Sequence, residues 1–179
     1  VLRRAADAGA EMIDLESDAH DALADLDLPG DCRVILSEHD FDRTPDDLTA
    51  AFERLLAVAP ERGVVKLATM AQRIDDGVRM LEAVREFRSR TGRDVIGLCM
   101  GEAGLITRVL APKVEAFLTF ASAAEGAESA PGQVTCREML DLYRFPQINP
   151  QTEVYGVIAK PVGHSMSPAI HNVAFAHQG

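Results

Sequence analysis

The feature that most constrains the fold of this chain is a regular alternation of short β-type runs with longer amphipathic segments. The expected strands cover residues 12–16, 33–38, 64–68, 95–100 and 117–121. Helical spacing marks residues 46–58, with Thr44 and Pro45 as N-cap and first turn, and residues 72–90, with Gly92 as a stop signal. Strict β-α alternation predicts parallel strands joined by crossover helices.

Polar residues within the expected strands separate the two architectures that fit this order, a doubly wound sheet and a (β/α) barrel. Side chains alternate between the faces of a strand, so in three consecutive strands the polar groups share one face: Asp14 and Glu16, Ser37 and His39, and Lys66. A sheet covered on both faces disfavours this, whereas a barrel has an inner face that holds the active site at its upper end. We therefore expect an α/β fold, an incomplete (β/α)8 TIM barrel with about five of eight strands.

Composition and charge exclude several classes of function. The 179 residues carry a formal net charge of -10, which argues against a nucleic-acid partner because phosphate binding requires clustered basic residues. No apolar run is long enough to span a membrane. Cys32, Cys99 and Cys136 are widely separated, so we expect no metal site and no disulfide, but buried free thiols in the cytoplasm.

The composition shifts after residue 145. Residues 146–153 lack periodicity and contain two prolines, which is typical of a linker. A new strand is expected over residues 154–159, and a new helix from about Ala169. Val1 opens within a helical pattern and Gly179 closes without a stop signal, so both ends are expected to be cut.

Lys66 is the sharpest candidate for chemistry, because VVKLA places one lysine inside an apolar strand. Burial disfavours the ammonium form and so favours a nucleophilic amine. The alternatives are a lysine that extends out from a strand end, or one paired with Asp14 or Glu16. His39, at the end of the preceding strand, could transfer protons, unless it is a loop histidine bonded to the backbone.

Two further groups could recognise a ligand. Arg108, in a short helix after the fourth strand, could grip a carboxylate, although a surface charge is the alternative. The loop from Ser129 to Gln133 is polar, and a simple turn is the alternative. Thr135 and Glu138 then have the spacing of a capping box at the start of a helix.

Four ordered segments resemble type I 3-dehydroquinate dehydratase: LSEHDFDRTP (36–45), VVKLAT (64–69), GEAGLITR (101–108) and SAPGQ (129–133). The resemblance covers about residues 1–145. It implies a (β/α)8 barrel that dehydrates 3-dehydroquinate to 3-dehydroshikimate without metal or redox cofactor. It also implies that the family's first three strands, with further glutamate and arginine residues, lie upstream of this chain, which alone would be inactive.

The same resemblance assigns roles to residues. Lys66 would form the Schiff base and His39 would transfer protons. Arg108 would bind the substrate carboxylate. Ser129 and Gln133 would contact the substrate from the closing loop. The apolar pocket would be lined by Phe41, Met100 and Phe120. A homodimer is one expected assembly, and 3-dehydroquinate the expected small-molecule partner.

The segment YGVIAKPVGHSMSPAIHN (155–172) resembles the substrate motif of shikimate dehydrogenase. Ser165 and Ser167 match the two serines that bind the shikimate carboxylate. Residues 154–179 would then be the first β-α unit of an α/β substrate domain, with the NADP-binding part beyond Gly179. The alternative is a proline-rich turn capped by serine before a helix. For the whole chain, the alternatives to a dehydratase are another Schiff-base barrel of the aldolase type, or a non-catalytic fragment.

Overall fold

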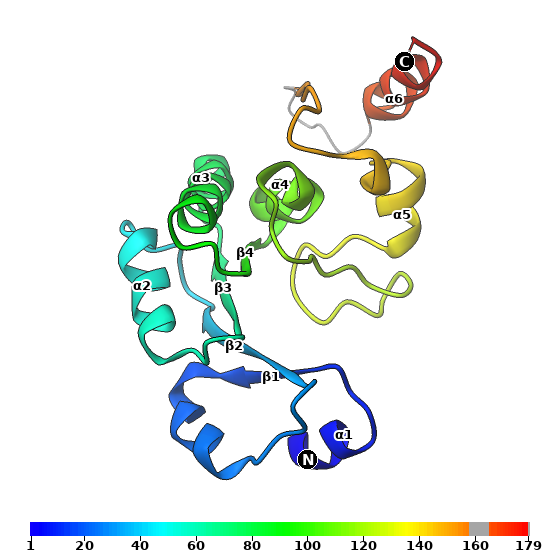
Figure 1. The fold of residues 1–179 in the computed structure, drawn as a ribbon. Helices are drawn as coiled ribbons and strands as arrows, with labels where there is room; N and C mark the ends of the chain where they lie inside the picture. The colour runs from blue at the N-terminus through cyan, green and yellow to red at the C-terminus, as the bar shows by residue number, and fades with distance from the viewer. Residues whose placement is uncertain (158–164, 179) are drawn as a thin grey trace.

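A parallel β-sheet forms the centre of the computed structural model, which describes residues 1–157 and 165–178 (Figure 1). Its strands are β1 (Met12–Glu16), β2 (Arg33–Asp40), β3 (Val64–Met70) and β4 (Val95–Met100), in the order β1-β2-β3-β4. All three pairings are parallel, and Lys66 lies in register with Ser37 of β2 and Ile96 of β4. The first four expected strands and the α/β class are confirmed.

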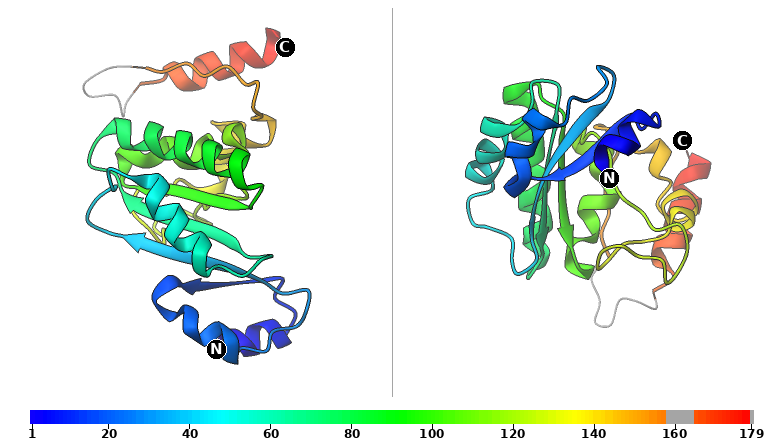
Figure 2. Two further views of the ribbon diagram at one scale, coloured as in Figure 1. Left: turned by 60° about the vertical axis from the view of Figure 1, so that its left-hand side comes forward. Right: turned by 90° about the horizontal axis from the view of Figure 1, so that it is seen from below.

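Helices and 3-10 turns connect the strands. They are α1 (Leu2–Asp7), η1 (Ser17–Asp25), α2 (Leu48–Val58), α3 (Ile74–Thr91), η2 (Glu102–Gly104), α4 (Leu105–Val109), η3 (Ala111–Val114), α5 (Cys136–Asp141), η4 (Phe145–Gln147) and α6 (Ser167–Gln178). Helices α2 and α3 lie side by side against one face of the sheet (Figure 2). Of the helices within the described ranges, none is both long and apolar enough to cross a membrane.

Local capping explains where the two covering helices begin and end. The carboxylate of Asp47 accepts a hydrogen bond from the Ala50 amide at 2.8 Å and caps α2. The expectation that Thr44 is this cap was wrong: its buried hydroxyl instead lies 3.0 Å from the Met70 carbonyl oxygen, to which it donates. Helix α3 ends at Gly92 with φ 67°, as expected, because glycine adopts the left-handed conformation without strain.

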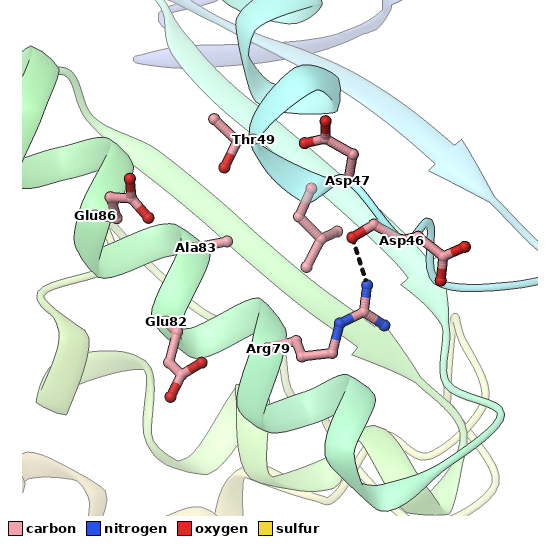
Figure 3. A pocket seen from close by; sticks show the side chains of 8 residues that line it. Asp46, Asp47, Thr49, Arg79, Glu82, Ala83 and Glu86 are labelled. Carbon is pink, nitrogen blue, oxygen red and sulfur yellow. Dashed lines mark hydrogen bonds between the residues drawn. The ribbon is translucent and has the colours of Figure 1, made fainter.

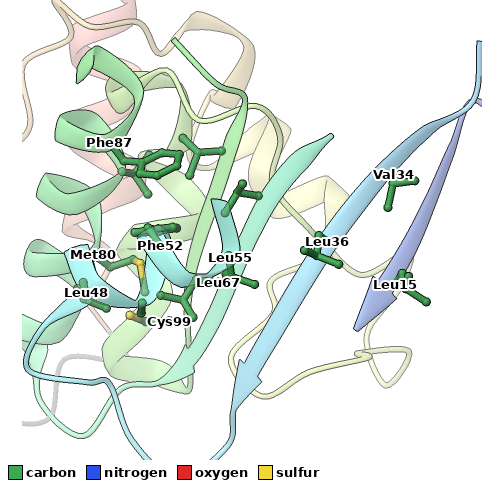
Figure 4. Close-up of a cluster of buried hydrophobic side chains, with 14 of the residues drawn as sticks. Leu15, Val34, Leu36, Leu48, Phe52, Leu55, Leu67, Met80, Phe87 and Cys99 are labelled. Atoms are coloured by element: carbon green, nitrogen blue, oxygen red, sulfur yellow. The ribbon is translucent and has the colours of Figure 1, made fainter. Parts of the chain in front are cut away.

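The two faces of the sheet pack against different parts of the chain. Helices α2 and α3 pack on one face of the sheet and form a buried hydrophobic cluster with it (Figure 4). Its large members include Leu36, Leu67, Phe52, Leu55, Met80 and Phe87. The other face presents Ile35, Val64, Ala68, Ile96 and Leu98, which pack with Phe117, Leu118 and Phe120. This second face carries Lys66 and corresponds to the inside of a barrel.

The fifth expected strand, residues 117–121, is not a strand. The Phe117 amide donates to the Val95 carbonyl at 2.8 Å, but the segment then leaves β4, and only an isolated bridge from Ser122 to Thr135 follows. Phe117 and Phe120 pack across the inner face, so side-chain burial replaces a β-ladder there. The described residues therefore contribute four strands rather than five.

The C-terminal region continues from α5, whose predicted capping box of Thr135 and Glu138 is confirmed. Residues 154–157 are not in a strand, and residues 158 and 159 of the expected strand lie outside the described ranges. Helix α6 begins at Ser167, two residues before the expected start. Asn172 of α6 donates to the Leu142 carbonyl at 2.6 Å, which attaches α6 to the chain beside α5.

Candidate functional site

Lys66 lies in the middle of β3 with its side chain on the inner face and only 7% of the residue exposed. Its Nζ donates to Asp14 Oδ2 at 2.6 Å and lies 4.8 Å from the centre of the Phe120 ring. The predicted burial of the amine is confirmed, and so is the alternative prediction that Asp14 pairs with it. The amine is thus held between a carboxylate and an aromatic face.

Ser37 lies beside Lys66 on the neighbouring strand β2 and is completely buried. Its hydroxyl donates to Asp14 Oδ1 at 2.6 Å, and Glu16 Oε1 lies farther away at 3.4 Å. The two oxygens of Asp14 therefore have different partners, the amine of Lys66 and the hydroxyl of Ser37. This geometry fixes the orientation of the carboxylate relative to the amine.

His39, at the end of β2, has a carboxylate partner rather than the backbone partner of the alternative prediction. Its Nδ1 lies 2.6 Å from Glu16 Oε1. An ionised carboxylate only accepts hydrogen bonds, so this contact places a proton on Nδ1 and leaves Nε2 as the atom that exchanges protons in the neutral ring. The ring stacks on Phe41, with centroids 5.6 Å apart, although Phe41 itself is 65% exposed.

Arg108 is buried in α4, so the alternative prediction of a surface helix charge was wrong. Its Nη1 donates to the Cys99 carbonyl at 2.8 Å, whereas Nε has no hydrogen-bond partner in the described part of the chain. Burial lowers the pKa of this guanidinium from its ordinary value. The hydrogen bond to Cys99 therefore anchors the arginine to the backbone of β4.

The loop of residues 129–133 is anchored at the C-terminal end of β4. The Gly101 amide donates to the Pro131 carbonyl at 3.0 Å, directly after the buried Met100. Within the loop, Gln133 Oε1 accepts from the Ser129 amide at 2.8 Å. The predicted loop residues therefore bond to each other and stand at the edge where Met100 ends its strand.

The cysteines lie away from this inner face. Cys99 is buried on the helix side of β4; burial raises the pKa of its thiol, while hydrogen bonds with Thr69 and Thr44 act in the opposite direction. Cys136 is exposed and Cys32 half-buried, so the prediction of buried thiols was right only for Cys99. Residues 1–157 and 165–178 contain no group of three or more His, Cys, Asp or Glu residues placed to hold a metal.

A hollow on the outer surface lies between the start of α2 and helix α3 (Figure 3). Its lining includes Asp46, Asp47, Glu82 and Glu86 with Arg79, which donates to the Asp46 carbonyl at 2.9 Å. The hollow belongs to the helix layer, whereas Lys66 belongs to the inner face of the sheet. Its acidic lining also disfavours an anionic ligand.

Ser165 and Ser167 lie together at the start of α6, where the Ser167 amide donates to Ser165 Oγ at 3.3 Å. Both residues are half-buried. Residues 158–164 of the expected substrate motif lie outside the described ranges. The structure therefore pairs the two serines but does not describe residues 158–164 before them.

A twisted parallel sheet with a buried lysine and carboxylates on its inner face defines the wall of an α/β barrel. The family model of type I 3-dehydroquinase matches residues 1–150. The chain belongs to this family.

Individual relatives agree with that assignment. The bifunctional 3-dehydroquinate dehydratase/shikimate dehydrogenase, chloroplastic, of Arabidopsis thaliana is 42% identical over 98% of this chain, which covers 29% of that relative. The 3-dehydroquinate dehydratase of Syntrophobacter fumaroxidans is 36% identical over 79% of this chain, which covers 60% of that relative. The chain therefore spans less than two thirds of either protein.

A solved structure shows the same architecture. The type I 3-dehydroquinate dehydratase from Clostridium difficile, described with covalently modified comenic acid, superposes with a TM-score of 0.66 at 26% identity. The match covers 80% of this chain and 58% of that one. The partial coverage agrees with an incomplete barrel.

Sequence reasoning did not assign site roles to Asp14, Ser37 and Glu16, although it placed all three on the inner face. The signal was the shared two-residue periodicity of three adjacent strands. What it lacked was the register, which determines that Asp14 reaches the amine while Glu16 reaches the imidazole.

Proposed function

We propose that the protein containing this chain dehydrates 3-dehydroquinate to 3-dehydroshikimate through a Schiff base on Lys66. The observation that carries this proposal is the amine of Lys66, buried on the inner face between Asp14 and Phe120. Membership of the type I 3-dehydroquinase family supports this reaction over the aldolase alternative.

The chemistry follows from the properties of an iminium ion. Lys66 condenses with the ketone of the substrate and water leaves, which gives a cationic C=N bond. This cation withdraws electrons, so a base can remove the neighbouring carbon-bound proton to form an enamine. The enamine then expels the hydroxyl group, and His39 supplies the proton that the leaving oxygen needs. The iminium is itself the electron sink, so the reaction requires no metal or redox cofactor.

The remaining site residues would hold the substrate. Arg108, whose buried Nε has no hydrogen-bond partner among the described residues, would bind the substrate carboxylate. Ser129 and Gln133 would contact the substrate from the closing loop. The apolar wall would be formed by Phe41, Met100 and Phe120.

Borohydride trapping of the native full-length protein tests the mechanism. With 3-dehydroquinate present, reduction should add one substrate-derived group to Lys66, detectable by peptide mass spectrometry. Lys66→Ala should abolish the adduct and lower turnover on the order of 10³-fold or more. Lys113→Ala is the matched control: among the described residues Lys113 donates to the linker carbonyls of Pro150 and Thr152, so its loss should leave both readouts unchanged.

Two results would count against this function. Normal turnover with unmodified Lys66 would exclude the Schiff base. Carbon–carbon bond cleavage of the substrate, instead of loss of water, would indicate the aldolase reaction.

We further propose that the protein is bifunctional, with residues 1–145 in a dehydratase, 146–153 a linker, and 154–179 the start of a shikimate dehydrogenase. The Arabidopsis relative aligns along 98% of this chain and carries both names. Ser165 and Ser167 would bind the shikimate carboxylate, and NADP would bind a part beyond residue 179. A dimer is the assembly we expect. The cytoplasmic location expected from the cysteines remains a prediction, while the plant relative is named chloroplastic.

A further inference from the structure

The path of the Lys66 side chain across the sheet is set by three adjacent strands. Lys66 of β3 lies in register with Ser37 of β2, and Asp14 of β1 lies in register with Ile35, two residues before Ser37. The amine reaches Asp14 at 2.6 Å, so it crosses the inner face of β2 at the level of Ser37. A small side chain at position 37 leaves room for this crossing.

Ser37 also fixes the carboxylate that receives the amine. Its hydroxyl has one proton, and the nearest acceptor is Asp14 Oδ1 at 2.6 Å; the Leu15 carbonyl and Glu16 Oε1 both lie at 3.4 Å. The serine is completely buried, so water does not compete for this hydrogen bond. Asp14 is 38% exposed at its side chain and would otherwise have freedom to turn.

The lysine nitrogen carries the same positive charge at the start and at the end of Schiff-base formation, although the amine that attacks the ketone is neutral. Condensation of an ammonium with a ketone gives a protonated iminium and one water molecule, so the nitrogen carries one positive charge before and after the step. A carboxylate placed beside that nitrogen stabilises both species. The ring of Phe120, 4.8 Å from Nζ, faces the same cation.

We propose that Asp14, oriented by Ser37, is the positioning residue and counter-ion of Lys66, both as the free ammonium and as the substrate iminium. The proposal deepens the function proposed above and rests on it for the iminium. The part that concerns the free amine stands on the geometry of Asp14, Ser37 and Lys66 alone.

The free amine is tested without substrate. Reductive methylation of Lys66 by formaldehyde and cyanoborohydride is followed against pH by peptide mass spectrometry in the native full-length protein. Removal of an opposite charge favours the neutral amine, so Asp14→Asn should move the half-reaction point to lower pH. Ser37→Ala should shift it less in the same direction, and Asp14→Glu should restore part of the shift.

Glu38→Gln is the matched control, because Glu38 is a carboxylate on β2, the strand of Ser37, and its side chain pairs with Arg54 on the other face. It should leave the half-reaction point unchanged. An unchanged point in Asp14→Asn would overturn the positioning role. If Asp14→Asn does not fold, an unchanged point in Ser37→Ala would overturn the role of the serine and with it the proposal.

The iminium is tested with 3-dehydroquinate and borohydride. At a pH above both half-reaction points, where the amine is neutral in either protein, Asp14→Asn should form the reduced Lys66 adduct about 10 to 100 times more slowly than the unmodified protein, as expected for a misplaced nucleophile. Equal adduct rates would overturn the counter-ion role while leaving the proposed function intact. Absence of any adduct in the unmodified protein would instead refute the proposed function, and the methylation titration would still decide the role of Asp14.

Discussion

Lys66 and His39 each have a different carboxylate, although the sequence offers both Asp14 and Glu16 on the same face. Asp14 holds the amine at 2.6 Å, and Glu16 holds His39 Nδ1 at 2.6 Å. This separation matters because a nucleophile and a proton-transfer group need independent orientation. One carboxylate shared by both groups would couple their protonation directly.

Thiol reactivity provides a test at the residue scale. Burial raises the pKa of the Cys99 thiol, so at neutral pH both access and ionisation oppose its modification. We expect a thiol reagent to modify the exposed Cys136 first and Cys99 only after unfolding, measured by mass spectrometry of the folded protein. Cys136→Ser should remove the fast phase. Rapid labelling of Cys99 in the folded protein would contradict the packing described around it.

At the scale of elements, two glycines join the end of β4 to the loop of residues 129–133. Gly101 has φ 83° and Gly132 has φ 72°, conformations that glycine adopts without strain. A Cβ on Gly132 would lie 2.4 Å from the Gly101 carbonyl oxygen, so the loop and the strand end approach more closely than any side chain allows. The contact places Ser129 and Gln133 at the edge of the inner face.

Gly132→Ala should therefore displace this loop. If the loop contacts the substrate, loss of one hydrogen bond to a charged ligand should raise KM for 3-dehydroquinate about tenfold. Gly126→Ala is a close control, because its φ is also positive, 79°, but its Cβ would meet nothing within 4 Å. Equal KM values for the two variants would show that backbone strain, rather than the contact with Gly101, explains any effect.

At the scale of the whole molecule, Asp94 connects elements that are not neighbours. Its Oδ2 accepts a hydrogen bond from Arg33 of β2 at 2.6 Å, and its Oδ1 accepts one from Arg88 of α3 at 3.1 Å. Partial burial acts to raise the pKa of Asp94, but the hydrogen bonds from both arginines prevail and hold it below its ordinary value. A carboxylate whose pKa is lowered by folding stabilises the folded state above its unfolded pKa, and this contribution is lost as pH falls through the folded pKa.

Asp94→Asn should lower the free energy of unfolding by about 1 kcal/mol at neutral pH, as expected for a partly exposed ion pair. The difference from the unmodified protein should shrink as pH falls below about 3.9 through the lower folded pKa, because the carboxylate becomes neutral in both states. Denaturant unfolding of both proteins at neutral and acidic pH measures this difference in the free energy of unfolding. The exposed Asp31→Asn serves as control and should show no such pH dependence. A constant difference between Asp94→Asn and the unmodified protein at all pH values would exclude this role.

The sequence predicted several features because they depend on local rules. Alternation of side chains along a strand placed Lys66 on the inner face without knowledge of its neighbours. The capping box at Thr135 and the left-handed Gly92 also follow from a few consecutive residues. The same local rule wrongly predicted Thr44 as the N-cap of the following helix, because its hydroxyl bonds to Thr69 and Met70 of β3 instead.

The sequence alone therefore determined the order of elements, the faces of three strands, and the types of chemical groups on the inner face. The tertiary structure decided which of these groups meet. The register of β1, β2 and β3 places Asp14 beside the amine of Lys66. Residues 117–121 pack on the inner face instead of forming a strand, and Arg108 is buried instead of exposed. The reason is physical: periodicity is a property of neighbouring residues, whereas hydrogen-bond partners and burial depend on residues far apart in the chain.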